Sequence, residues 1–239
     1  MRTAVLTHDP LLQGFYTVSE AARLLRIGQR QRIYGWLAGN ENGSREPIIQ
    51  RDYQPINSLH ELSFWDLMEV RFIDHFQKQG VSLQTLRKAA DAARREFNQR
   101  HPFALSKTKF MTDRKRVFLQ TVEETGDKKT RDILGNQYEM YDVIEEILAR
   151  GVTFDPKSHL AEVWYPLQGE YPKVFVDRRY AYGHPVVSES RVPTSALYRL
   201  WRAESGDTPR VAFWYKITSE EVREAVEFET KLNETRLNG

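Results

Sequence analysis

The segment Phe15–Leu37 constrains the fold most, because it carries the signals of two short helices joined by a tight turn. Thr17 and Glu20 have the spacing of a capping box, in which the threonine oxygen accepts a backbone N–H and the carboxylate accepts the threonine amide. A helix should therefore begin near Val18. It should end at Ile27-Gly28, since glycine adopts the left-handed conformation that closes a helix. The segment predicts a helix-turn-helix.

The second helix of this segment, expected over residues 29–38, has one apolar and one polar face. Ile33 and Leu37 are four residues apart and should be buried, with Trp36 beside them. The side chains left outside are Arg30, Gln31 and Tyr34. The whole segment is also cationic, because no carboxylate lies between Glu20 and Glu41, whereas four arginines do: Arg23, Arg26, Arg30 and Arg32.

A cationic second helix is typical of a helix that enters the major groove of DNA. Arginine can bind guanine and glutamine can bind adenine through paired hydrogen bonds, while other arginines contact phosphates. Base contacts are therefore expected from Arg30, Gln31, Arg32 and Tyr34, and phosphate contacts from Arg23, Arg45 and Arg51. The alternative is an ordinary solvated pair of helices with a basic face.

Two short extended runs, over residues 47–51 and 56–62, predict a β-hairpin after the second helix. A hairpin in this position is typical of a wing that lies over the phosphate backbone, where Arg45, Arg51 and Tyr53 would supply donors and a ring. A plain structural hairpin is the alternative.

Two longer helices should follow the hairpin. Ser63 and Asp66 predict a capped helix that extends to about Gln79, and Ser82 can cap another that ends before His101-Pro102. Their aromatic and aliphatic residues recur at helical spacing, which indicates a protein core rather than a cofactor pocket.

Residues 15–103 resemble the winged helix-turn-helix of MerR-like regulators, with the motifs TVSEAARLL, IYGWL, LSFWDLMEVRF and GVSLQTLRKAA in order. The resemblance implies dimerisation through the later helices. A homodimer on an inverted-repeat operator DNA is also expected because one short helix reads too few base pairs for specificity. The helices around residues 64–76 and 83–97 are the expected seam.

Composition excludes several function classes. The 239 residues contain no cysteine, which removes disulfides, thiolate catalysis and cysteine metal sites. No two of the six histidines have the close spacing of a helical metal pair, and no glycine-rich phosphate loop occurs. We therefore expect no cofactor, no metal and no enzymatic activity; His184 is the only histidine worth probing. Without a signal peptide or an apolar run of membrane-spanning length, the chain is expected to be cytoplasmic.

The chain divides into four expected parts: an amino-terminal arm (1–14), the winged domain (15–103), a mixed connecting region (104–180) and a carboxy-terminal unit (181–239). In the connecting region, alternation predicts a hairpin over residues 107–122, a helix over 138–149, and strands over 161–167 and 173–177. The expected fold class is α+β and mainly helical, with central short strands and a trihelical module at the end.

The segment from Gly183 to Thr194, followed by helices over 195–203, 208–214 and from Thr218 onward, resembles a domain of unknown function that is common beside bacterial toxin genes. Its core reads G-x-P-V-I-x-G-T-R-I-P. The matching residues are Gly183, Pro185, Val186, Val187, Arg191, Val192 and Pro193. Glu189-Ser190 replaces the Gly-Thr pair, which weakens any role that depends on a glycine turn there.

The order of the two resemblances is similar to that of VapB-type antitoxins, which pair with a PIN-domain ribonuclease toxin. This resemblance implies an autorepressor that binds operator DNA and silences the toxin through residues 182–239. The tail is acidic and expected to be frayed, so it could order on the toxin. The cations expected to enter a carboxylate cluster of the toxin are Arg223, Lys231 and Arg236; alternatively, the glutamates meet a basic rim. The alternative function is a ligand-responsive MerR-like transcriptional regulator, with a stand-alone enzyme third.

Overall fold

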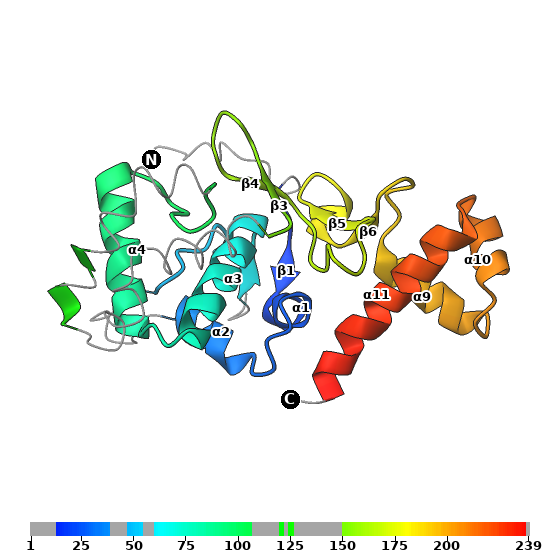
Figure 1. Ribbon diagram of the computed structural model, residues 1–239, viewed down its shortest axis with the longest axis horizontal. Coiled ribbons are helices and arrows are strands. Elements are labelled where there is room, and N and C mark those ends of the chain that lie inside the picture. The colour runs from blue at the N-terminus through cyan, green and yellow to red at the C-terminus, as the bar shows by residue number, and fades with distance from the viewer. Residues whose placement is uncertain are drawn as a thin grey trace.

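The computed structural model describes residues 13–38, 47–54, 60–106, 120–121, 124–126 and 150–237. It is an α+β fold in which helices α3 and α4 lie at one end of an elongated molecule and helices α9, α10 and α11 at the other, with small antiparallel sheets between them (Figure 1). The helix expected over residues 138–149 lies outside the described residues. So does most of the hairpin expected over 107–122, of which residues 120–121 are helical rather than extended.

The helix pair that opens the described chain was predicted correctly. Strand β1 (Tyr16–Thr17) leads into α1 (Val18–Leu24), whose capping box between Thr17 and Glu20 is present. Helix α2 (Gln31–Leu37) follows, with Ile33, Trp36 and Leu37 buried as expected. The end of α1 differs from the prediction, because Arg26 rather than Gly28 takes the left-handed conformation, at φ 55°.

The prediction of a strand over residues 47–51 is wrong, and so is the prediction of a hairpin that contains it. Residues 47–54 contain no strand, and β2 (Glu61–Leu62) pairs antiparallel with β1 instead. The physical reason is that Ile48 and Ile49 are both buried and donate their backbone N–H groups to the carbonyl oxygen of Trp36 at 3.0 and 3.3 Å. An alternating strand would have exposed one of the two isoleucines.

Helices α3 (Phe64–Lys78) and α4 (Leu83–Phe97) begin at the predicted caps, Ser63 and Ser82. The apolar residues of α3 are buried inside the chain, where Phe72 stacks on Phe103 with ring centroids 4.3 Å apart. Because this face already has an intramolecular partner, α3 cannot offer it as the seam of a homodimer without rearrangement.

A four-stranded antiparallel sheet has the order β3-β4-β5-β6, with strands Val152–Phe154, Ala161–Trp164, Val174–Asp177 and Val186–Val187. Strands β4 and β5 confirm the strands expected over 161–167 and 173–177, although both are shorter. The segment that follows α4 adds to this sheet, since the N–H of Ala161 donates to Ala104 at 2.9 Å.

The turn η3 (Ala181–Gly183) ties the sheet to β1. All three residues have positive φ values of 46°, 56° and 82°. Tyr182 accepts the N–H of Phe15 at 2.8 Å, and the hydroxyl of Tyr16 donates to the carbonyl of Gly183 at 2.6 Å.

Gly183→Ala should lower the free energy of unfolding by about 2 kcal/mol, since left-handed strain and the loss of one buried hydrogen bond each cost roughly 1 kcal/mol. An added Cβ at this position would overlap the Tyr16 hydroxyl, whereas one at Gly35 of α2 meets nothing within 4 Å. Gly35→Ala is therefore the control and should stabilise, by about 1 kcal/mol. Urea unfolding of the two variants measures both values; equal effects would contradict the prediction.

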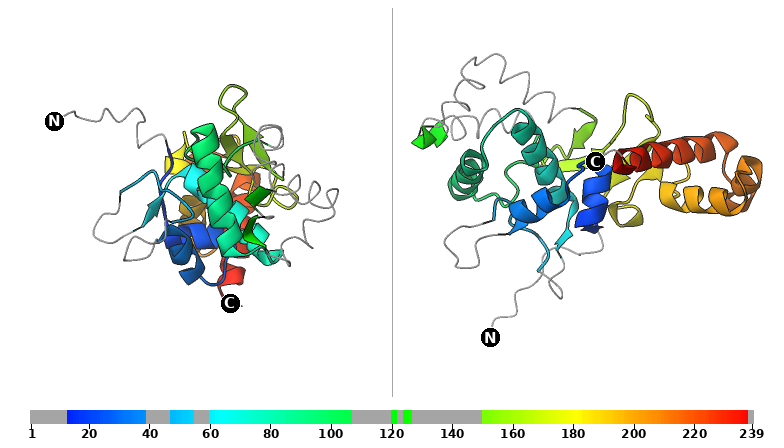
Figure 2. Two further views of the ribbon diagram at one scale, coloured as in Figure 1. Left: turned by 90° about the vertical axis from the view of Figure 1, so that its left-hand side faces the viewer. Right: turned by 90° about the horizontal axis from the view of Figure 1, so that it is seen from below.

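The last part of the chain forms α9 (Thr194–Ala203), α10 (Thr208–Tyr215) and α11 (Ser219–Leu237), close to the predicted helices. The capping box of Thr218 and Glu221 is present. The expectation of a frayed tail is wrong, because α11 continues to Leu237 and buries Val226, Phe228 and Leu232. Figure 2 shows α11 running back from α10 toward α1, which it contacts.

None of the helices in the described ranges combines the length and the apolar character that crossing a bilayer would need.

Candidate nucleic-acid and partner interfaces

The outer face of α2 presents the residues that the sequence assigns to base recognition. Gln31 and Tyr34 are exposed on α2, and Arg30 is exposed at its N-cap. Arg30 and Tyr34 are four residues apart and therefore lie on the same side of the helix. The Arg30 guanidinium has a contact with the Ser19 hydroxyl at 3.3 Å, which solvent and DNA could replace. The structure thus brings these three side chains together on one surface.

Two other expected DNA contacts are held by partners inside the chain. The Arg23 guanidinium pairs with the carboxylate of Glu229 and donates to Asn233 at 3.1 Å, both on α11. Arg32 pairs with Asp74 at 3.1 Å, donates to Gln77 and lies over the ring of Trp36. Both arginines join elements of the fold, and a role in DNA binding would require them to change partners.

The remaining expected DNA contacts lie in the loop before α3. Tyr53 donates its hydroxyl to the carbonyl of Gly14 at 2.5 Å, and its ring packs against Phe15 with centroids 5.7 Å apart. Arg51 is partly buried, and this burial lowers the pKa of its guanidinium. Arg45 lies outside the described residues.

A second exposed surface, on helix α10, was not predicted from the sequence. Phe213, Trp214 and Tyr215 of α10 are 78%, 61% and 37% exposed, at the end of the molecule farthest from α4 (Figure 1). We call these three residues the aromatic patch. Successive helical residues are about 100° apart, so three aromatic residues in a row cannot all face one core. That rule could have identified the patch, because Val211 and Ala212 already supply the buried face.

The three cations assigned to the toxin are not gathered at one site. Arg223 is exposed near the start of α11, while Lys231 lies two turns later and pairs with Glu170 at 3.5 Å. The side chain of Arg236 lies outside the described residues.

A cavity of about 530 Å³ opens where α1 meets the carboxy-terminal helices. Its lining includes Arg23, His184, Arg199 and Glu229, so it is rich in charged and polar groups. The His184 ring also packs edge-on against Tyr16, with centroids 6.0 Å apart.

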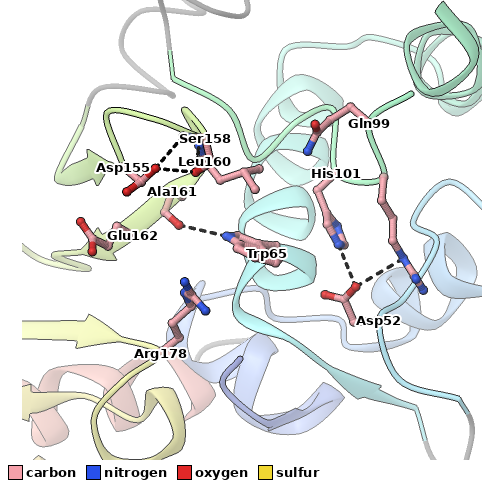
Figure 3. Close-up of a pocket in the computed structure, with 11 residues that line it drawn as sticks. Asp52, Trp65, Gln99, His101, Asp155, Ser158, Leu160, Ala161, Glu162 and Arg178 are labelled. Atoms are coloured by element: carbon pink, nitrogen blue, oxygen red, sulfur yellow. Dashed lines mark hydrogen bonds and ion pairs between the residues drawn. The ribbon is translucent and has the colours of Figure 1, made fainter. Parts of the chain in front are cut away.

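Another cavity, of about 550 Å³, lies between the amino-terminal helices and the loop that joins β3 to β4. Figure 3 shows His101 and Asp52 on one side of it and Asp155 and Glu162 on the other, with Trp65 between them in this view. Trp65 donates its indole N–H to the carbonyl of Ala161 at 3.0 Å and holds the two sides together.

His101 is buried among three carboxylates at the edge of this second cavity. Its Nε2 lies 3.0 Å from an oxygen of Asp52, and its Nδ1 lies 3.7 Å from Asp66 and 3.5 Å from Glu69. Burial lowers the pKa of His101, but the bond to Asp52 and the charges of Glu69 and Asp66 outweigh burial and raise it to about 10. Burial raises the pKa of Asp66 to about 6.

Comparison with known proteins finds similarity to a curated protein and to a solved structure. Over 227 residues the chain is 25% identical to the Mycobacterium tuberculosis protein named "Putative antitoxin VapB45", a match that covers 89% of this chain and 92% of that protein. The crystal structure of Rv2018 from Mycobacterium tuberculosis matches with a TM-score of 0.65 at 24% identity, covering 92% of this chain and 98% of that chain. The second match shows a shared fold. No protein-family model matches the chain.

Proposed function

We propose, from the similarity to VapB45, that this protein is the antitoxin of a toxin-antitoxin pair and represses its own operon. The observation that carries the proposal is the extent of that match, which covers 89% of this chain and 92% of VapB45. The PIN-domain ribonuclease is the expected toxin, from the resemblance of the sequence to VapB-type antitoxins.

Expression in bacteria tests this proposal. The product of the adjacent reading frame should arrest growth when expressed alone, and growth should be restored when this protein is expressed with it. The two proteins should also copurify. An adjacent product that is harmless and does not bind this protein would contradict the assignment.

The DNA-binding part of the proposal places operator contacts on the outer face of α2. Arg30, Gln31 and Tyr34 project from one surface, and a bidentate arginine or glutamine can discriminate between bases. A winged arrangement would need residues 39–46 and 55–59, which lie outside the described residues. A homodimer remains part of the proposal, because two copies of α2 would read the two halves of a palindrome.

Arg30→Ala should weaken operator binding by about 1 to 3 kcal/mol and relax the base preference at one position in each half-site. Arg202→Ala is the matched control, since Arg202 is an exposed arginine at the end of α9 and should leave operator binding unchanged. Binding to a library of operator variants measures both properties. Loss of affinity that is equal for all sequences would assign Arg30 to phosphate rather than to a base.

A ligand-responsive regulator is the second candidate, favoured by the cavity of about 530 Å³ that touches both Arg23 of α1 and Glu229 of α11. A ligand bound there would contact the helix pair and the carboxy-terminal helices together. Its polar lining argues against an apolar effector. A small molecule that shifts operator affinity without any toxin present would support this second function.

A further inference from the structure

Three buried polar atoms beside α3 lack a hydrogen-bond partner. They are Asp66 Oδ1, Glu69 Oε2 and His101 Nδ1, on side chains that are at least 97% buried. The two carboxylates need a cation beside them. The protonated His101 ring, whose pKa they raise, is one such cation, and a metal ion bound at Nδ1 in place of the proton would be another. The grouping of His101 with Asp66 and Asp52 also satisfies the spacing of ligands for one metal ion.

The distances leave room for a metal ion in place of the Nδ1 proton. The nitrogen-to-oxygen separations of 3.5 and 3.7 Å exceed the 2.7–3.2 Å or so of an N–H···O hydrogen bond. Four ligands at about 2.1 Å from a tetrahedral zinc ion are separated by about 3.4 Å, which is close to both observed values. A metal ion at Nδ1 is therefore within reach of either carboxylate. To bind both, Asp66 and Glu69 must move closer together, because among the described residues the ligand atoms within 4.8 Å of one another belong to Asp52, Asp66 and His101.

The second atom of each side chain is already fixed by another group. Asp66 Oδ2 accepts the N–H groups of Ser63 at 2.9 Å and Asp52 at 3.2 Å, and Glu69 Oε1 accepts that of Phe103 at 3.3 Å. His101 Nε2 lies 3.0 Å from Asp52 Oδ1, to which it can donate. A carboxylate that accepts the far N–H of a histidine leaves the lone pair of the near nitrogen directed at the metal, as in most protein zinc sites.

We infer that Asp66, Glu69 and His101 bind a divalent transition-metal ion, for which zinc is the preferred probe, and that Asp52 orients His101 as its hydrogen-bond partner. One imidazole and two carboxylates without sulfur suit zinc or manganese, and zinc binds such donors more tightly. Arg94 lies 3.9 Å from Glu69 Oε2, and its charge reduces the affinity. The cavity that His101 lines gives the ion a route to the site.

A bound ion would stabilise the fold by joining three separate segments of the amino-terminal part. Asp66 and Glu69 lie in the first turns of α3, His101 lies in the segment after α4, and Asp52 lies in the loop before β2. The site does not depend on DNA or on a toxin, so it can be tested in the isolated protein.

The test uses full-length protein without an affinity tag, stripped with EDTA and transferred to metal-free buffer. Titration with zinc chloride should show one equivalent bound at this site. Zinc at about 100 times its Kd should raise Tm by roughly 5 to 10 °C. No rise in Tm and no stoichiometric binding by the unmodified protein would overturn the inference, whatever the variants do.

Three variants separate a metal site from general zinc binding by histidines. Glu69→Gln keeps the size of the side chain and should weaken zinc binding by at least about 100-fold, while Asp52→Asn should weaken it by about 10- to 100-fold. His184→Gln is the control, because His184 lines the other cavity. Zinc binding by Glu69→Gln that equals that of the unmodified protein would overturn the inference.

Discussion

Replacing Phe213 and Trp214 with serine should weaken toxin binding strongly and leave the protein folded and able to bind DNA. Both rings are more than half exposed, so their loss removes little of the core. At interfaces, aromatic anchors of this kind each contribute about 2 kcal/mol or more when truncated to alanine, which is roughly 30-fold in Kd. The double variant should therefore bind the toxin at least about 30-fold more weakly, by calorimetry.

Phe15→Ser is the matched control. Phe15 is 43% exposed, similar in chemistry to the rings of the aromatic patch, and lies beside the helix-turn-helix rather than on α10. Toxin affinity should not change in this variant. A different outcome is also informative: if the double variant converts a dimer to a monomer but still binds the toxin, the aromatic patch is a contact between two copies of this chain.

The aromatic patch changes the proposed location of the toxin site within the carboxy-terminal helices. Arg223, Lys231 and Arg236 were predicted to bind the toxin because a metal-dependent ribonuclease has acidic groups that cations can contact. Of these, Arg223 is exposed, whereas Lys231 is paired with Glu170. Interface energy comes mainly from buried aromatic residues, and charges at the rim affect the rate of association more than the affinity. We therefore propose the patch as the anchor for a toxin, with Arg223 in a peripheral role.

Local signals predicted local structure well. The capping boxes at Thr17, Ser63 and Thr218 each involve residues three positions apart, so they can be read from the sequence, and all three helices begin where expected. The predicted hairpin is wrong because the partner of β2 is β1, more than 40 residues earlier. No property of residues 47–62 alone reveals that Ile48 and Ile49 are held by Trp36.

The candidate sites show the same limit. Exposure of Arg30 and Tyr34 follows from helix periodicity, and the structure agrees with it. The partners of Arg23 could not be foreseen, since Glu229 and Asn233 lie more than 200 residues further along the chain. The site at His101 was missed for the same reason: a search for closely spaced histidines cannot find one histidine beside two carboxylates of α3, more than 30 residues earlier.

The contact between α11 and α1 should contribute strongly to the stability of the fold. Arg23→Ala should lower the free energy of unfolding by about 3 kcal/mol, because it leaves the buried carboxylate of Glu229 without its cation. This loss of unfolding free energy is at the low end of the range for buried ion pairs, because a quarter of the Arg23 side chain is exposed. Urea unfolding measures it. Arg199→Ala, also at the rim of the cavity shared by these helices, is the control and should have little effect.

The same ion pair determines whether Arg23 is available to DNA. In Glu229→Gln the side chain keeps its size and can still accept the hydroxyl of Thr194, but it no longer neutralises Arg23. Arg23 could then reach a phosphate, so the slope of log K against log salt should steepen by about 0.9 for each copy of the protein bound. Arg23→Ala alone should leave the slope unchanged. A flatter slope in Arg23→Ala would show that Arg23 already contacts phosphate, and that DNA competes with α11 for it.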